Sequence, residues 1–253
     1  MARKIISIHS FRGGTGKSNT TANVAAQLGL MGLRVGVVDT DIQSPGIHVL
    51  FGLGSSDISR SLNDFLWQRC DITEAAYDTS QQQNIPEPGA VFLVPSSVEV
   101  DEIVNVLREG YDVSLLTEGF KNLINELMLD ILLIDTHPGL NEETLFSIAI
   151  SNTLAVVMRP DYQDYEGTGV TIEVAKSLGV PNLHVIVNKT PNVLKPEDVV
   201  TRVTDAYNIS DVTVLPHCDE LMNLASEGIF SLRFPDHPLS AQYRELAQSL
   251  VQS

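Results

Sequence analysis

The 253-residue sequence has few cysteines and no long apolar run. Cys70 and Cys218 lie far apart, without a Cys or His neighbour at metal-ligand spacing, so two reduced thiols are expected rather than a cysteine metal site. No uninterrupted apolar stretch approaches the roughly 18 to 20 residues that span a bilayer. The first eight residues also lack the longer apolar stretch of a signal peptide. These absences predict a cytoplasmic protein.

Positive charge is also scarce. The chain carries 16 Lys and Arg residues against 32 Asp and Glu residues, a formal net charge of −16. Its basic residues are scattered, and only Arg3 and Lys4 are adjacent. Non-specific nucleic-acid binding requires a basic surface that displaces counterions from phosphates, and anionic lipid repels an acidic surface. Neither non-specific DNA binding nor direct membrane insertion is therefore expected.

Short β-rich apolar runs alternate with amphipathic stretches, a pattern typical of βα units around a parallel sheet. The sequence predicts an α/β fold: a doubly wound, mostly parallel sheet of about seven to eight strands with helices on both faces, in one domain over residues 1–253. Strands are expected at residues 4–9, 34–38, 90–94, 130–134, 153–158, 183–187 and 212–215. Helices are expected at residues 17–30, 115–127, 141–151, 169–178, 196–206 and 240–251.

The region 55–88 breaks this alternation. It holds two short helical patterns, one of which opens at Asp71 with Glu74 three residues later, the spacing of a capping box. The polar stretch 79–88 that follows reads as a surface loop.

A glycine-rich segment, FRGGTGKS at residues 11–18, follows the first predicted strand and opens the first predicted helix. Strand, glycine loop and helix N-terminus together make an anion cradle, because glycines let backbone N–H groups curl around phosphate oxygens. Lys17 supplies a point charge for the phosphates, and Ser18 offers a hydroxyl to Mg²⁺. The segment predicts an ATP and Mg²⁺ site that includes Gly13, Gly14, Thr15, Gly16, Lys17, Ser18 and Asn19.

Carboxylates follow two other predicted strands. Asp39 and Asp41 come after one buried run, and Asp135 ends another. Open α/β sheets bind ligands at the carboxyl edge of their strands, where such groups can hold magnesium-bound water or orient an attacking water. The alternatives are a simple helix or turn cap for Asp41 and a structural carboxylate for Asp135.

The motifs together resemble the MinD/ParA family, and the resemblance covers nearly the whole chain. The run RGGTGKS at 12–18 resembles the deviant Walker A box of that family, K-G-G-x-G-K-T/S, which lacks the glycine that the standard motif would place at Phe11. The run VVDTDI at 37–42 is similar to the family's switch I, and LLIDTHPG at 132–139 is similar to its Walker B and switch II. The dipeptides Leu215–Pro216 and Glu227–Gly228 resemble MinD proteins more than ParA proteins.

The resemblance implies roles for individual residues. Asp41 would orient the attacking water, and Asp39 would lie in the outer shell of the metal. The strand-end Asn188 would read adenine, although Asn also caps strand ends. The implied catalytic residues are Lys17, Asp41 and Arg12; the implied metal residues are Ser18, Asp39 and Asp135; the implied base-binding residues are Asn188 and Pro216.

Two positions depart from the family pattern. Arg12 stands where the family has the lysine that reaches across a sandwich dimer to the partner's nucleotide, and arginine can also grip phosphate. It could equally make a local contact within its own chain. His137 replaces a residue that is usually proline, so switch II could be looser, or the imidazole could be a neutral filler.

The resemblance implies a Mg²⁺-dependent switch ATPase, slow without an activating partner. ATP would bridge a homodimer that engages an activating or cargo protein, and hydrolysis to ADP and phosphate would release it. The C-terminal helix lacks a basic face, so a MinD-like membrane anchor is not expected. The alternatives are a nucleotide-sensing module with little turnover and an Mrp-type iron–sulfur carrier, which would need a Cys-x-x-Cys pair late in the chain.

Overall fold

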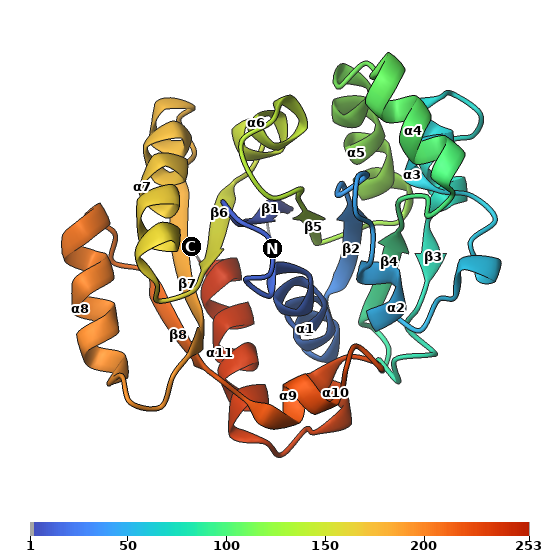
Figure 1. Cartoon of the computed structure of the whole chain (residues 1–253). Coiled ribbons are helices and arrows are strands. Elements are labelled where there is room, and N and C mark those ends of the chain that lie inside the picture. The colour runs from blue at the N-terminus through green and yellow to red at the C-terminus, as the bar shows by residue number, and fades with distance from the viewer. Residues whose placement is uncertain (1–2, 253) are drawn as a thin grey trace.

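The computed structural model describes residues 3–252 and builds them around one eight-stranded sheet (Figure 1). The strand order is β3-β4-β2-β5-β1-β6-β7-β8, and within the described residues neighbouring strands pair in parallel except β3 with β4, which are antiparallel. The strands are β1 (Lys4–His9), β2 (Arg34–Asp39), β3 (Tyr77–Asp78), β4 (Ala90–Val94), β5 (Ile131–Asp135), β6 (Thr153–Met158), β7 (Asn182–Thr190) and β8 (Val212–Pro216).

Helices lie in every connection between consecutive strands except that from β3 to β4. The longer helices are α1 (Lys17–Leu30), α4 (Val100–Glu109), α5 (Ser114–Glu126), α6 (Glu142–Ala149), α7 (Tyr162–Ser177), α8 (Pro196–Tyr207) and α11 (Pro238–Gln252). The short ones are α2 (Ile47–Leu50), η1 (Ser55–Asp57), α3 (Leu62–Leu66), η2 (Ile72–Ala75), α9 (Asp219–Asn223) and α10 (Phe230–Arg233).

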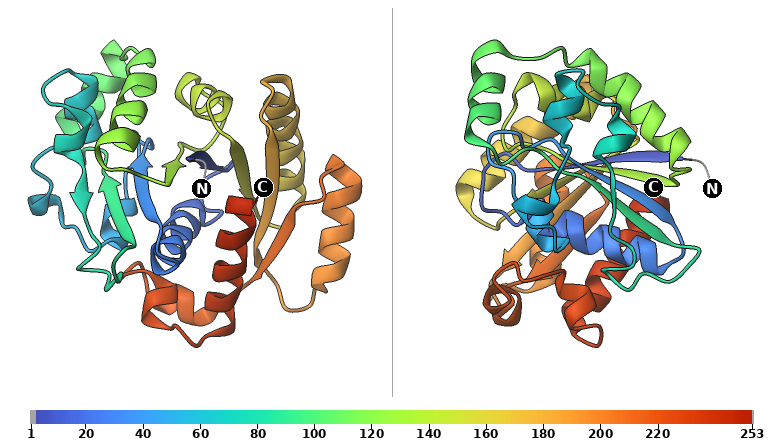
Figure 2. Two further views of the ribbon diagram at one scale, coloured as in Figure 1. Left: turned by 180° about the vertical axis from the view of Figure 1, so that it is seen from behind. Right: turned by 90° about the vertical axis from the view of Figure 1, so that its right-hand side faces the viewer.

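Alternation along β5 shows how the sheet is buried on both faces. Ile131 and Leu133 belong to the core beneath α1 and α11, whereas Leu132 and Ile134 belong to the core beneath α3 and α5. Successive side chains of a strand point to opposite faces, so a strand that is buried throughout needs helices on both sides. Figure 2 shows this layering, with α1 and α11 on one face and α5, α6 and α7 on the other.

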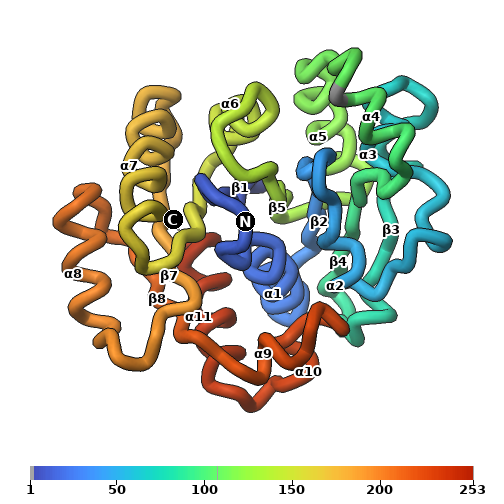
Figure 3. The backbone as a smooth tube through the Cα atoms, in the orientation of Figure 1, coloured from blue at the N-terminus to red at the C-terminus, as the bar shows by residue number. Residues whose placement is uncertain are grey.

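The predicted fold class is confirmed, and all seven predicted strands are present: three have the predicted bounds, and the other four are shifted by one to three residues at one or both ends. The prediction missed β3, which pairs antiparallel with β4 at the far edge of the sheet (Figure 3). A strand of two residues is too short to show an alternating pattern, and only its pairing with β4 identifies it.

The helix predictions need two corrections. Helix α7 begins at Tyr162 rather than at residue 169, because Asp161 caps its N-terminus by accepting a hydrogen bond from the Asp164 N–H at 3.0 Å. Gly167 lies inside the helix, where the ring of Phe11 occupies the space that a side chain would need. The sequence interpretation also missed α4 and the short helices α2, α9 and α10.

In the region 55–88, the predicted capping box is present. Glu74 accepts a hydrogen bond from the Asp71 N–H at 2.8 Å, and η2 follows. The predicted loop 79–88 runs from β3 to β4 and contains turns.

The sheet brings distant segments to one edge. The carboxyl ends of the parallel strands β1, β2, β5 and β7 lie at this edge. In the sheet, β1 lies between β5 and β6, and the strand order reverses there. Ligands of open α/β sheets bind at such a reversal. Within residues 3–252, no helix is long and apolar enough to cross a membrane.

Candidate functional site

The glycine-rich segment forms a cavity at the start of α1. We call it the loop cavity; its volume is about 330 Å³. Gly16 precedes α1 in a left-handed conformation and provides no side-chain cap, so the first N–H groups of the helix face ligand or solvent. The lining residues are Ser10, Gly13, Gly14, Thr15, Gly16, Lys17, Ser18, Asn19, Asp41, Ser44, Pro138 and Lys189.

The backbone of this loop requires glycine at two positions. Gly14 has φ +80° and Gly16 has φ +94°, values that L side chains rarely adopt. A Cβ at Gly16 would also collide with the side-chain amide of Asn188. That amide donates a hydrogen bond to the Thr15 carbonyl at 2.9 Å, and Lys189 Nζ donates to the Gly14 carbonyl at 2.9 Å. The end of β7 therefore anchors the glycine loop from behind.

Lys17 places a buried ammonium group at the base of the loop cavity. The residue is 5% exposed, and its Nζ lies 3.0 Å from Asp135 Oδ1. This contact is an ion pair without hydrogen-bond geometry, so the ammonium N–H groups have no acceptor of good geometry. A buried ammonium of this kind favours an added anion, because unsatisfied N–H groups are costly in a low-dielectric environment.

Asp135 is the centre of a polar cluster beneath α1. Its Oδ2 accepts a hydrogen bond from Ser18 Oγ at 2.7 Å, and its Oδ1 accepts one from Thr21 Oγ1 at 2.8 Å. The predicted metal residues Ser18 and Asp135 are thus in direct contact. The sequence interpretation missed Thr21, whose position one turn after Lys17 was the available signal.

Asp39 completes the set of oxygen donors. It is fully buried at the end of β2, in register with Asp135 on β5. Burial and the neighbouring charge of Asp135 raise the pKa of Asp39 well above its usual range. Its Oδ1 accepts the Asp41 N–H at 3.0 Å, whereas its Oδ2 is buried without a hydrogen-bond partner. An orphaned carboxylate oxygen beside Asp135 and the Ser18 hydroxyl is a donor set that suits Mg²⁺.

Asp41 faces the loop cavity from the segment after β2. Its Oδ1 is contacted by His137 Nδ1 at 2.7 Å, by Ser44 Oγ at 3.0 Å and by the Ser44 N–H at 3.2 Å. Burial alone would raise the pKa of Asp41, but the hydrogen bond from His137 and the charge of Lys17 outweigh it and lower the pKa. Asp41 is therefore an ionised carboxylate that can accept hydrogen bonds.

Comparison with known proteins places this geometry in a family. A family model described as an AAA domain matches residues 3–182, more than half of the chain. A putative septum site-determining protein MinD from Emiliania huxleyi is 25% identical over 89% of this chain and 78% of its own length. The chain belongs to the MinD/ParA family of P-loop ATPases.

Other members show the breadth of this family. An uncharacterised ATP-binding protein of Methanocaldococcus jannaschii is 28% identical over 97% of this chain and 87% of its own. An iron–sulfur cluster carrier protein of Pyrococcus furiosus is 26% identical over 97% and 85% of the two chains. Among solved structures, MinD from Pyrococcus horikoshii in complex with Mg-ADP superposes with a TM-score of 0.80, at 24% identity over 98% and 96% of the chains.

Arg12 occupies the position of the family's signature lysine. Its guanidinium forms ion pairs with carboxylates of its own chain. Its Nη1 lies 3.4 Å from Asp164 Oδ1 and 3.9 Å from Asp161 Oδ1, both near the start of α7. Asp164 is buried and also binds Arg159. The arginine side chain is 40% exposed, so it remains accessible at the molecular surface.

Of the two predicted base-binding residues, only Asn188 has a hydrogen bond to the glycine loop within the described part of the chain. Asn188 is buried against the glycine loop, and Pro216 ends β8 opposite Thr190 of β7. Among the described residues that line the loop cavity, neither is present. Their role towards a base stays a prediction.

The two cysteines are free thiols in different parts of the core. Cys70 packs at the margin of the core under α3 and α5, and Cys218 belongs to the core under α1 and α11.

Folding brings Cys218 near Glu220 and His237, a trio that the sequence spacing did not reveal. However, His237 Nδ1 accepts the Leu239 N–H at 3.1 Å, so the proton of a neutral ring lies on the other nitrogen. In that state, neither ring nitrogen of His237 has a free lone pair that could bind a metal.

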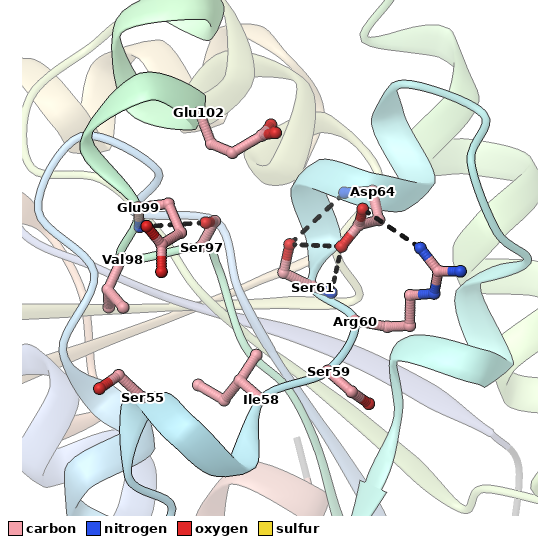
Figure 4. A pocket seen from close by; sticks show the side chains of 10 residues that line it. All are labelled: Ser55, Ile58, Ser59, Arg60, Ser61, Asp64, Ser97, Val98, Glu99 and Glu102. Atoms are coloured by element: carbon pink, nitrogen blue, oxygen red, sulfur yellow. Dashed lines mark hydrogen bonds and ion pairs between the residues drawn. The ribbon is translucent and has the colours of Figure 1, made fainter.

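A second recess of about 200 Å³ lies between the 55–64 and 97–102 segments (Figure 4). Asp64 and Ser61 face Glu99 and Ser97 across it, and arginines neutralise part of its acidity: Arg60 lies 3.6 Å from Asp64. This recess shares no lining residue with the loop cavity, so it is a separate feature.

Proposed function

We propose that this protein is an ATP-dependent dimerising switch ATPase. ATP bound with Mg²⁺ closes a homodimer, the dimer engages a protein partner or cargo, and hydrolysis to ADP and phosphate releases it. The observation that carries this proposal is the buried, unsatisfied ammonium of Lys17 at the base of a cavity formed by a helix N-terminus. Triphosphate oxygens would satisfy both the ammonium and the free N–H groups.

The polar cluster beneath α1 supplies the magnesium site. Ser18 would contribute its hydroxyl, and the carboxylates of Asp135 and Asp39 would hold the ion through its water ligands. When bound, Mg²⁺ would neutralise charge on the phosphate oxygens. Burial and the neighbouring charge of Asp135 raise the pKa of Asp39, and a bound cation would favour the ionised form of both carboxylates.

Asp41 is assigned to the attacking water. It faces the loop cavity with an ionised carboxylate and lies across that cavity from the glycine loop. Lys17 would take up charge on the transferring phosphate, so that catalysis consists of positioning and electrostatic stabilisation. Asn188 and Pro216, at the ends of β7 and β8, would contact the base.

Arg12 is assigned to the nucleotide of the partner subunit. The Arg12 side chain is 40% exposed, and the buried Asp164 keeps its ion pair with Arg159, so Arg12 can exchange its carboxylate partners for a phosphate without leaving Asp164 unpaired. A planar guanidinium can bind phosphate bidentately after that exchange. Turnover would then depend on dimer formation and would be slow until a partner protein stabilises the closed site.

Two alternative functions draw on other observations. The contacts of Arg12 within its own chain favour a nucleotide-sensing module with little turnover. The similarity to an iron–sulfur carrier favours cluster transfer, but the chain offers only Cys70 and Cys218, in separate parts of the core. We also treat residues 1–253 as one ATPase domain of the cytoplasm, where ATP is present and thiols stay reduced.

Light scattering and phosphate release test the proposal. Solution mass is measured for the wild type and Asp41→Ala, each with Mg²⁺ and either ADP or ATP. We expect the wild type to form a dimer only with ATP. The Asp41→Ala variant should accumulate as this dimer, and its phosphate release should be about tenfold slower or more. Asp205→Ala, which removes an exposed carboxylate on α8, is the charge-matched control and should behave as wild type. A mass that ignores the nucleotide would refute the dimer, and dimerisation without phosphate release would support the sensor.

A further inference from the structure

His137 makes a contact that the family resemblance does not explain, because the corresponding position usually holds proline. Proline has no side-chain donor, whereas the His137 ring places Nδ1 at 2.7 Å from Asp41 Oδ1. A carboxylate oxygen can only accept, so the imidazole N–H is the donor. A hydrogen bond to an ionised acceptor at this length belongs to the stronger class in proteins.

Among the described residues, every hydrogen bond to the Asp41 carboxylate is made to the same oxygen, Oδ1. His137 Nδ1, Ser44 Oγ and the Ser44 N–H are its contacts, and each of them is to Oδ1. Asp41 and Ser44 line the loop cavity, whereas His137 is not among the described residues that line it. The histidine therefore holds the carboxylate from outside the cavity, and Oδ2 keeps its lone pairs for another donor.

The backbone that carries His137 is fixed at several points. The His137 carbonyl accepts a hydrogen bond from Thr144 Oγ1 at 3.2 Å, and Thr144 lies in the first turn of α6. Two residues later, the Gly139 N–H donates to the Ser10 carbonyl of the glycine loop at 3.1 Å. A ring mounted on such a segment can hold Asp41 in a defined place relative to the glycine loop.

We propose that His137 is a positioning residue for hydrolysis: its Nδ1–H holds Oδ1 of Asp41 so that Oδ2 is presented to the attacking water. This inference rests on the proposed function, since it assigns His137 to the same water-orienting carboxylate. The imidazole neither touches the phosphate nor transfers a proton in this role. It couples the segment after β5 to the segment after β2.

Three substitutions separate positioning from simple space filling. In His137→Asn, the amide Nδ2 stands as many bonds from Cα as the imidazole Nδ1, so it can donate to Asp41. His137→Gln carries the amide one carbon further out, and His137→Ala has no donor. We expect kcat for phosphate release to fall on the order of tenfold or more in the Ala and Gln variants, with KM for ATP within about twofold of wild type. His137→Asn should restore kcat to within about threefold.

A double-mutant comparison tests whether the histidine acts through Asp41. In an Asp41→Ala background, His137→Ala should lower the residual rate by less than about twofold, because its partner is already absent. An equal further loss in both backgrounds would overturn the proposal. So would a His137→Asn variant as slow as His137→Ala, or a His137→Ala variant with the wild-type kcat.

The contact itself can be measured without turnover. ¹⁵N NMR of the wild-type imidazole reports which ring nitrogen carries the proton, and we expect Nδ1–H for His137 and loss of that preference in Asp41→Ala. An Nδ1 without a proton in the wild type would refute the proposal even if the Ala variant fails to fold. The two proposals fail differently: an inactive wild type with the Nδ1–H signal refutes the ATPase, whereas an active wild type with unaffected His137 variants refutes only the positioning role.

Discussion

Thr21 offers a sharp test of the cluster beneath α1, because it is fully buried and its hydroxyl has one hydrogen for two acceptors. Thr21 Oγ1 lies 2.8 Å from Asp135 Oδ1 and 3.1 Å from the Lys17 carbonyl. The shorter distance and the negative charge assign the hydrogen to Asp135. Thr21→Val keeps the shape of the side chain and removes this donor.

The size of the effect follows from the acceptor. A hydrogen bond to a charged group contributes about 1.5 to 3 kcal/mol, whereas one to a neutral carbonyl contributes about 0.5 to 1.5 kcal/mol. Thr171 on α7 is a matched control, since it is also fully buried and its Oγ1 donates only to the Gly167 carbonyl, at 3.1 Å. We expect Thr21→Val to lower the free energy of unfolding by about 2 kcal/mol and Thr171→Val by about 1 kcal/mol.

Urea unfolding followed by circular dichroism measures both free energies, and the melting temperatures should fall by about 4 to 8 °C and about 2 to 4 °C. Thr21 also orients Asp135, so the Mg²⁺ concentration for half-maximal phosphate release should rise about tenfold in Thr21→Val and stay unchanged in Thr171→Val. Equal losses of stability in the two variants would show that the Thr21 hydroxyl does not serve Asp135.

Two further predictions concern the glycine loop and a buried imidazole. Gly16→Ala should abolish ATP binding in titration calorimetry, because it strains a left-handed residue and displaces Asn188; Gly179→Ala, left-handed but in open space, should bind ATP normally. Burial lowers the pKa of His9 to about 3, so the folded state binds its proton less readily than the unfolded state. The His9 contribution is therefore full above pH 6.5 and is lost as pH falls towards 3, by about 2 kcal/mol at pH 5. In urea unfolding, the free energy of unfolding of His9→Asn should therefore fall by about 2 kcal/mol less than that of the wild type between neutral pH and pH 5. Equal pH profiles of the two proteins would contradict the lowered pKa of His9.

Much of the geometry of the glycine loop was predictable because it is encoded locally. Left-handed Gly14 and Gly16, the uncapped start of α1 and the position of Lys17 all lie within one short run of sequence. The placement of Asp39 and Asp135 at the edge of the sheet was also predictable, because each ends a buried strand and parallel strands end at the same edge of a sheet.

Side-chain partnerships between segments were not predictable in the same way. Whether Asp39 lies beside Asp135 depends on β5 lying next to β2, and periodicity carries no information on strand order. The same is true of Arg12, whose ion pair with Asp164 exists because α7 starts beside the glycine loop. The short strand β3 escaped detection because its pairing with β4, rather than its own pattern, defines it.

The sequence by itself determined the βα alternation, the glycine-rich loop after β1 and the types of chemical group at the ends of the strands. Each of these depends on backbone preferences and apolar spacing within a few consecutive residues. Only the tertiary structure decided that Thr21 holds Asp135 and that His137 holds Asp41. These contacts join residues about 100 positions apart, and they form because β1, β2 and β5 end at one edge of the sheet, around the start of α1.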